Sequence, residues 1–169
     1  MTAWRRHRFF HHLATDHGSV RRAFPKASLA RIEAAIAEGE RIHSGQVRFA
    51  VEPALPLARV LRGVAPRERA LEVFGNLRIW DTEENCGVLV YLLLADRDVE
   101  IVADRGIHGH VGTAAWKAVC AKMEAAFRAG RFTEGVEAGI AEINALLARH
   151  YPREGRAVGN ELPNRPVVL

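Results

Sequence analysis

The chain has 169 residues, of which 49% are hydrophobic and 26% charged, and its formal net charge is +4 at pH 7. This length and composition are those of one ordinary globular domain, which excludes a disordered or fibrous protein. No apolar run is long enough for a membrane-spanning helix, and the basic N-terminus does not resemble a secretory signal. Because Cys86 and Cys120 are too few for a disulfide framework, we expect reduced thiols in a cytoplasmic protein.

Residues 1–27 are expected to form a basic N-terminal arm. Residues 1–31 hold seven Lys and Arg against one Asp, so the rest of the chain is slightly acidic. Such an arm could contact anionic lipid, nucleic acid or a partner, and its candidate contact residues are Trp4, Arg5, Arg6 and Arg8. We favour the simpler alternatives, a solvated tail or an apolar anchor docked on the domain, because no groove-reading motif accompanies the few aromatic residues.

The body of the chain is expected to begin with a helix and a strand. Ser28 is a suitable N-cap, and apolar residues follow at helical spacing as far as Ile42. Residues 46–52 alternate between apolar and polar side chains, which is typical of a strand, and Pro53 ends its ladder.

Helical segments are expected over residues 56–61 and from Pro66 to about Trp80. Residues 88–95 are then an unbroken apolar run, which indicates a strand buried on both faces. A strand–helix–strand passage of this length favours a parallel pair with a right-handed connection.

A hairpin and two helices complete the body. Asp96-Arg97-Asp98 is a typical turn sequence, and residues 99–103 form the returning strand. Amphipathic helices are expected from Gly112 to Gly130 and over residues 133–151. Gly139 within the second helix either allows a close approach to the sheet or merely weakens the helix.

This order of elements predicts an α/β fold, in which a small mixed β-sheet is sandwiched between helices as α/β/α layers. The expected organisation is the arm over residues 1–27, one domain over residues 28–151 and an extended tail over residues 152–169. The tail is rich in Pro and Gly and is expected to lie along the domain.

The predicted topology gathers polar residues at one edge of the sheet. If the first two strands are parallel, they begin at the edge where the third strand ends, and acidic and polar residues lie there. Oxygen ligands in a loop suit Ca²⁺ or Mg²⁺. The alternative is that the acids are solvated and that the last Asp pairs with its Arg neighbour or caps a turn. The residues concerned are Asp81, Glu83, Glu84, Asn85, Asp104 and Arg105.

Other candidates for chemistry are weaker. His108 and His110 could ligate a transition metal, but no third ligand is near in the sequence, so a loop with two exposed imidazoles is favoured. Cys86 has no base at a predictable spacing, and Cys120 lies on an apolar helical stripe. The sequence has no P-loop, no dinucleotide-binding glycine pattern and no Gly-x-Ser-x-Gly elbow. No catalytic residue can therefore be assigned.

Several of these segments, in this order, resemble the TPM-domain family, also called the TPM phosphatase or thylakoid-lumen acid phosphatase-like family. The resemblance covers roughly residues 28–151, and the C-terminal residues 160–169 resemble the ending of a short bacterial branch that lacks the signal peptide and membrane helix of longer relatives. The segments that carry it are Gly45–Val51, Glu84–Val90, Asp98–Ile107 and Phe127–Val136.

The resemblance implies an α/β/α sandwich, divalent-cation binding and the acid phosphatase activity ascribed to a plant member. The cation is Ca²⁺ in some relatives, so Ca²⁺ is expected before Mg²⁺, and no organic cofactor is expected. By motif, the site residues carried over are Glu84, Asn85, Asp104 and Arg105. The chain departs from the family pattern at Cys86, where relatives often have Asn, at Asp104, where many have Gly, and at His108, where relatives often have an acid.

Three functions follow as hypotheses, in ranked order. The first is a non-catalytic interaction module that responds to a divalent cation and associates with membrane-protein partners, such as a membrane-associated TPM relative. The second is a metal-assisted acid phosphatase in which Arg105 holds a phosphate oxygen. The third is binding of anionic lipid or nucleic acid through the arm, with nucleic acid ranked last. The expected location is the cytoplasm, at the inner face of the membrane.

Overall fold

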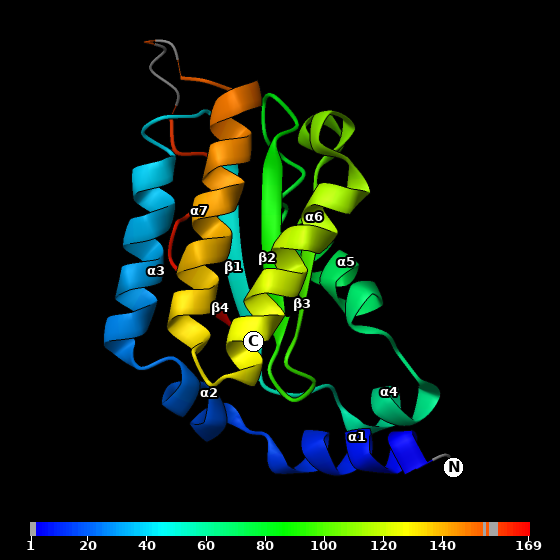
Figure 1. The fold of residues 1–169 in the computed structure, drawn as a ribbon. Coiled ribbons are helices and arrows are strands. Elements are labelled where there is room, and N and C mark those ends of the chain that lie inside the picture. The colour runs from blue at the N-terminus through cyan, green and yellow to red at the C-terminus, as the bar shows by residue number, and fades with distance from the viewer. Residues whose placement is uncertain (1–2, 154, 156–158) are drawn as a thin grey trace.

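The computed structural model describes residues 3–153, 155 and 159–169, with side chains from residue 6 onward. In this part of the chain, helices pack on both faces of a four-stranded mixed sheet (Figure 1). None of the described helices has the length and apolarity that crossing a membrane requires. The elements are α1 (Ala3–Ala14), α2 (His17–Ala23), α3 (Lys26–Gly39), β1 (Gln46–Glu52), α4 (Leu57–Arg62), α5 (Pro66–Asn76), β2 (Gly87–Leu93), β3 (Asp98–Ala103), α6 (Arg105–Arg128), α7 (Phe132–His150) and β4 (Val167–Val168).

The strand order β3-β2-β1-β4 confirms the predicted parallel pair and hairpin. β1 and β2 are parallel, and their register begins at Gln46 opposite Gly87. β2 and β3 are antiparallel, with Val88 opposite Ala103. The tail was expected to be extended and to lie along the domain. In the structure it also forms β4, which pairs in parallel with β1.

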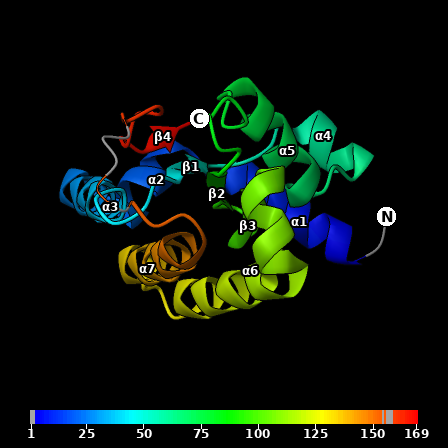
Figure 2. The same ribbon diagram turned by 90° about the horizontal axis from the view of Figure 1, so that it is seen from above.

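Two apolar cores fill the space between the sheet and its helices, which confirms the α/β/α layers. One face of the sheet packs against α3, α6 and α7, through residues such as Ile36, Met123 and Ile140. The other face packs against α4 and α5, through Val60 and Val73. Figure 2 shows the helices on either side of the strands. Every residue of β2 is buried, as its unbroken apolar sequence predicts.

The described part of the N-terminal stretch is folded onto the domain. α2 contributes Val20 to the main core, and Phe24 follows it there. α1 docks through polar groups, because Arg8 and His12 are buried and both bind Asp96 in the hairpin turn. This stretch is therefore a docked element and not a solvated tail.

Two helix starts differ from the sequence prediction. α3 begins at Lys26 after Pro25, so Ser28 lies inside the helix and does not cap it. α6 begins at Arg105, because the side chain of Asp104 accepts a hydrogen bond from the Arg105 N–H and caps the helix. The chain then kinks at Gly112, where φ is 77° and ψ is 162°, so the segment expected as a loop is the first part of α6.

Candidate functional site

The edge of the sheet at which β1 and β2 begin and β3 ends brings four of the six predicted polar residues together. The N–H of Asp104 donates to the carbonyl of Gly87 at 2.8 Å, and the N–H of Gly106 donates to the carbonyl of Asn85 at 3.1 Å. The loop before β2 and the first turn of α6 therefore lie side by side. We call Glu84, Asn85, Asp104 and Arg105 the polar edge.

Glu84 links the polar edge to the approach of β1. The hydroxyl of Ser44, which precedes β1, donates a short hydrogen bond to Glu84 Oε2. Ser44 is itself buried, and its carbonyl lies 3.8 Å from the thiol of Cys86. Sequence reasoning missed Ser44, since nothing local marks a serine before a strand as a partner of a residue forty positions away.

Asn85 and Arg105 form a second contact across the edge. The backbone of Asn85 is left-handed, with φ of 52°, a conformation that Asn tolerates better than most residues. Arg105 Nε donates to Asn85 Oδ1 at 3.3 Å, and Arg105 is exposed. Asp104 therefore caps α6 and does not form an ion pair with Arg105, whose side chain contacts Asn85.

The two carboxylate oxygens of Asp104 lie in different surroundings. Its Oδ1 accepts the N–H of Arg105 at 2.7 Å, whereas its Oδ2 is buried and has no hydrogen-bond partner among the described residues. A buried carboxylate oxygen without a partner is costly. This oxygen is consequently a candidate ligand for a cation or a hydrogen-bond donor.

Oxygen atoms also crowd around Gly106. A Cβ atom at this position would lie 2.5 Å from the carbonyl oxygen of Asn85, 2.9 Å from that of Glu84 and 2.7 Å from the hydroxyl of Tyr151. Only glycine fits here. The backbone and hydroxyl oxygens of this cradle add to the side-chain oxygens of the polar edge.

The buried groups beside the edge are poor nucleophiles and bases. Burial, together with the charges of Glu84 and Glu161, raises the pKa of the Cys86 thiol to about 12. Burial lowers the pKa of His43, whose Nε2 lies 3.1 Å from Asn144 Oδ1, so this imidazole stays neutral. The thiolate that nucleophilic catalysis requires is not available at neutral pH.

Of the remaining predicted metal ligands, His108 follows the polar edge along α6, where its backbone N–H donates to the carbonyl of Asp104 at 2.9 Å. Asp81 is exposed, and its backbone N–H donates to Arg78. His110 stacks on His150, with ring centroids 5.0 Å apart, and His108 is half-buried. Across the described residues, no three His, Cys, Asp or Glu side chains gather in a way that could hold a metal ion.

The residues predicted to contact a partner from the N-terminal arm differ in their exposure. Arg8 is buried and pairs with Asp96, with Nη2 and Oδ2 2.9 Å apart, so it serves the docking of α1. Arg6 is exposed and remains available for a partner. The side chains of Trp4 and Arg5 lie outside the described residues.

Comparisons with known proteins identify one matching family model and two solved structures with a similar fold. The family model described as the TPM domain matches residues 21–146. The NMR structure of BA42 protein from the psychrophilic bacterium Bizionia argentinensis is 26% identical, with a TM-score of 0.74 over 86% of this chain and 95% of that chain. The N-terminal domain of a protein from P. gingivalis shares the fold at 15% identity, with a TM-score of 0.60 over 76% of this chain and 80% of that chain. A search of curated proteins found no match.

Proposed function

Because the chain belongs to the TPM-domain family, we propose that it is a non-catalytic interaction module whose polar edge responds to a divalent cation. The observation that carries this proposal is the buried Oδ2 of Asp104, which has no partner among the described residues. A cation at this oxygen would offset its cost of burial.

The donor set suits a weak Ca²⁺ site better than a transition-metal site. Glu84, Asn85 and Asp104 offer hard oxygen atoms, which Ca²⁺ prefers, and backbone carbonyls lie beside them. Only two of these groups are carboxylates, and Arg105 adds a positive charge nearby. We therefore expect a dissociation constant on the order of 10⁻⁴ to 10⁻³ M, with Ca²⁺ preferred over Mg²⁺.

A non-catalytic role is supported by the chemistry around the edge. The Cys86 thiol is held protonated by burial, and Glu84 accepts the Ser44 hydroxyl. A cation would then act by neutralising acidic groups on a surface, which changes what that surface binds. Next to the loop, Trp80 is 53% exposed, and exposed Trp side chains often anchor protein–protein contacts.

The partner we propose is another protein, such as a membrane-associated TPM relative, with the protein held at the inner face of the membrane. α1 supports the peripheral part of this proposal, since Phe10 and Leu13 are about 60% exposed beside basic residues. Deleting the exposed apolar groups with Phe10→Ser and Leu13→Ser should weaken binding to anionic vesicles. Unchanged binding by this variant would remove the membrane from the proposal.

Thermal melting of the chelated protein tests the cation site. Ca²⁺ at ~100 times its Kd should add about 2.7 kcal/mol, which raises Tm by roughly 5–11 °C in a domain of this size. Asp104→Asn should abolish the shift. Glu83→Gln removes the same charge from an exposed neighbour that lies outside the polar edge, and this control should keep the shift. Equal loss in both variants, or no Ca²⁺ shift in the native protein, would refute the cation site.

A second candidate function is a metal-assisted acid phosphatase. The exposed Arg105 lies at the start of α6 beside Asp104, where it could hold a phosphate oxygen while the cation polarises the phosphoryl group. The assay is hydrolysis of p-nitrophenyl phosphate across pH with Ca²⁺ or Mg²⁺. Turnover that is lost in Arg105→Gln would favour this candidate over the non-catalytic module.

A further inference from the structure

A polar cavity lies at the opposite end of the sheet from the polar edge. It has a volume of about 380 Å³ and is lined by α1, α2, the β2–β3 turn and the α6–α7 connection. Because β2 runs seven residues from one end to the other, the two sites are about 20 Å apart. The cavity is within the size range of small-molecule sites.

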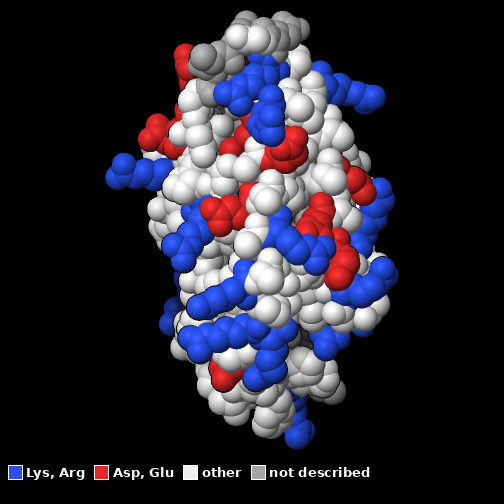
Figure 3. Space-filling model, turned by 90° about the vertical axis from the view of Figure 1, so that its left-hand side faces the viewer, with Lys and Arg blue, Asp and Glu red and all other residues white. Residues whose placement is uncertain are grey.

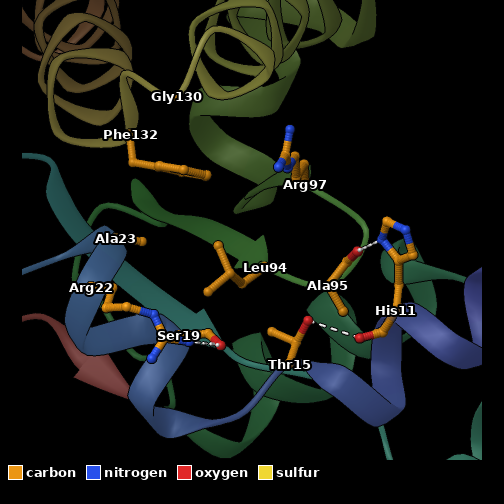
Figure 4. Close-up of a pocket in the computed structure, with 10 residues that line it drawn as sticks. All are labelled: His11, Thr15, Ser19, Arg22, Ala23, Leu94, Ala95, Arg97, Gly130 and Phe132. Atoms are coloured by element: carbon orange, nitrogen blue, oxygen red, sulfur yellow. Dashed lines mark hydrogen bonds between the residues drawn. The ribbon is translucent and has the colours of Figure 1, made fainter.

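Basic side chains line this cavity on two sides. Figure 4 shows Arg22 on one side, with Arg97 and His11 on the other, and Phe132 and Leu94 between them. Figure 3 shows Lys and Arg gathered near the same end of the molecule, around α2 and the start of α3. Among the residues that the structure describes, the lining includes no Asp or Glu.

Arg22 is available to a ligand. Its Nη2 donates to the Ser19 hydroxyl at 2.8 Å, which fixes its direction. The nearest carboxylate is that of Asp16, 4.0 Å away, and both side chains are about three-quarters exposed. An exposed pair at this distance is weak, and Asp16 is already engaged in capping α2.

Arg97 is held in an unfavourable backbone conformation at the cavity. Its φ is 52°, in the left-handed region that Gly or Asn usually occupies in a turn. Its guanidinium has no hydrogen bond or ion pair to any described residue, although Asp96 and Asp98 flank it in sequence. A strained residue that presents a free cation to a cavity is more typical of a ligand site than of a turn selected for stability.

We propose that this cavity binds the phosphoryl group of a small phosphate monoester between Arg22 and Arg97. Guanidinium groups match phosphate oxygens in geometry and charge, and the Ser19 hydroxyl holds the Arg22 guanidinium in place by accepting its hydrogen bond. Leu94 and Phe132 provide an apolar wall for a short carbon chain. The ester is either a free metabolite-sized molecule or the headgroup of a phospholipid.

Titration of the full-length protein with glycerol 3-phosphate, followed by calorimetry and backbone NMR, tests the proposal. Saturable binding should shift the amide signals of Ser19, Arg22 and residues 94–97. Arg22→Gln and Arg97→Gln should each weaken binding about tenfold or more, because each removes a charge-assisted contact. The control Arg21→Gln removes the same charge from an exposed neighbour outside the cavity and should change the affinity less than twofold.

Vesicles of phosphatidylcholine with and without phosphatidic acid distinguish the two sources of the phosphate. Binding of the free ester with indifference to phosphatidic acid identifies a soluble ligand. Binding to phosphatidic acid that Arg97→Gln abolishes, without binding of the free ester, identifies a lipid headgroup. The proposal is overturned if neither probe binds, or if Arg21→Gln weakens binding as much as the two cavity variants, which would indicate a diffuse basic surface.

Discussion

Asp98 at the start of β3 is a carboxyl group in an unfavourable place. Burial, together with the charges of Glu100, Glu124 and Asp96, raises its pKa to about 7. Its Oδ1 is buried and has no hydrogen-bond partner among the described residues. The folded protein therefore keeps the proton between about pH 4 and pH 7, while the unfolded chain releases it. Stability must fall as the pH rises through this range.

Asp98→Asn should stabilise the protein at neutral pH, because the amide has the same shape and cannot ionise. We expect a gain of about 1–2 kcal/mol at pH 8 and little change at pH 4, measured by urea unfolding. Glu33→Gln, at an exposed position on α3, should show no such pH-dependent gain. A gain of equal size at both pH values would contradict the raised pKa.

The packing of α6 on α7 depends on a glycine within α7. A Cβ atom at Gly139 would lie 2.3 Å from the sulfur of Met123 on α6, so the two helices approach closely at this point. The sequence left two alternatives for Gly139, a close approach to the sheet or merely a weaker helix. The structure shows a close approach, but to α6 and not to the sheet. Gly75 near the end of α5 is the opposite case, since a Cβ there meets nothing within 4 Å.

Gly139→Ala should destabilise the protein by about 1–3 kcal/mol, because overpacking outweighs the gain in helix propensity. Gly75→Ala makes the same chemical change in open space and should stabilise by up to ~1 kcal/mol. Thermal melts of both variants provide the measurement. If Gly139→Ala is also stabilising, Met123 can move aside and the interface is looser than its geometry indicates.

At the scale of the whole molecule, α1 is attached to the domain through polar contacts with the β2–β3 turn and with the segments that flank α4. The N–H of Leu55 donates to His12 Nδ1 at 3.0 Å, so the neutral ring carries its proton on Nε2 and donates it to Asp96. Arg8 reaches the same carboxylate. Burial alone would raise the pKa of Asp96, but the hydrogen bonds from His12 and Arg8 lower it overall, so this attachment weakens only as the pH falls below about 4.

Asp96→Ala should release α1 from the rest of the protein. Removing the anion leaves the buried Arg8 without this ion pair, at a cost of about 2–4 kcal/mol in urea unfolding. Hydrogen exchange should accelerate across α1 more than across β1 and β2. Asp81→Ala, at an exposed position, is the matched control and should change stability by less than about 0.5 kcal/mol. Uniform acceleration across the protein would indicate that α1 unfolds only with the whole domain.

Local pattern was enough to predict most elements of the sheet and its helices. The unbroken apolar run of β2, the alternation of β1 and Pro66 at the start of α5 each carry their signal within a few residues. The early start of α6 was not predictable from apolar spacing. It depends on the Asp104 cap and on the kink at Gly112, which connects a first helical segment to the rest of α6.

The residue pattern is enough to predict the α/β/α layers, the parallel pair, the hairpin and the edge at which Glu84 and Asp104 meet. These depend on periodicity and on the connection rules of strands, which act locally along the chain. Three features become visible only in the folded chain: Ser44 binds Glu84, Asp104 Oδ2 is buried, and Arg22 and Arg97 line one cavity. Such contacts join residues tens of positions apart, and their geometry is set by how whole elements pack rather than by any pattern within them.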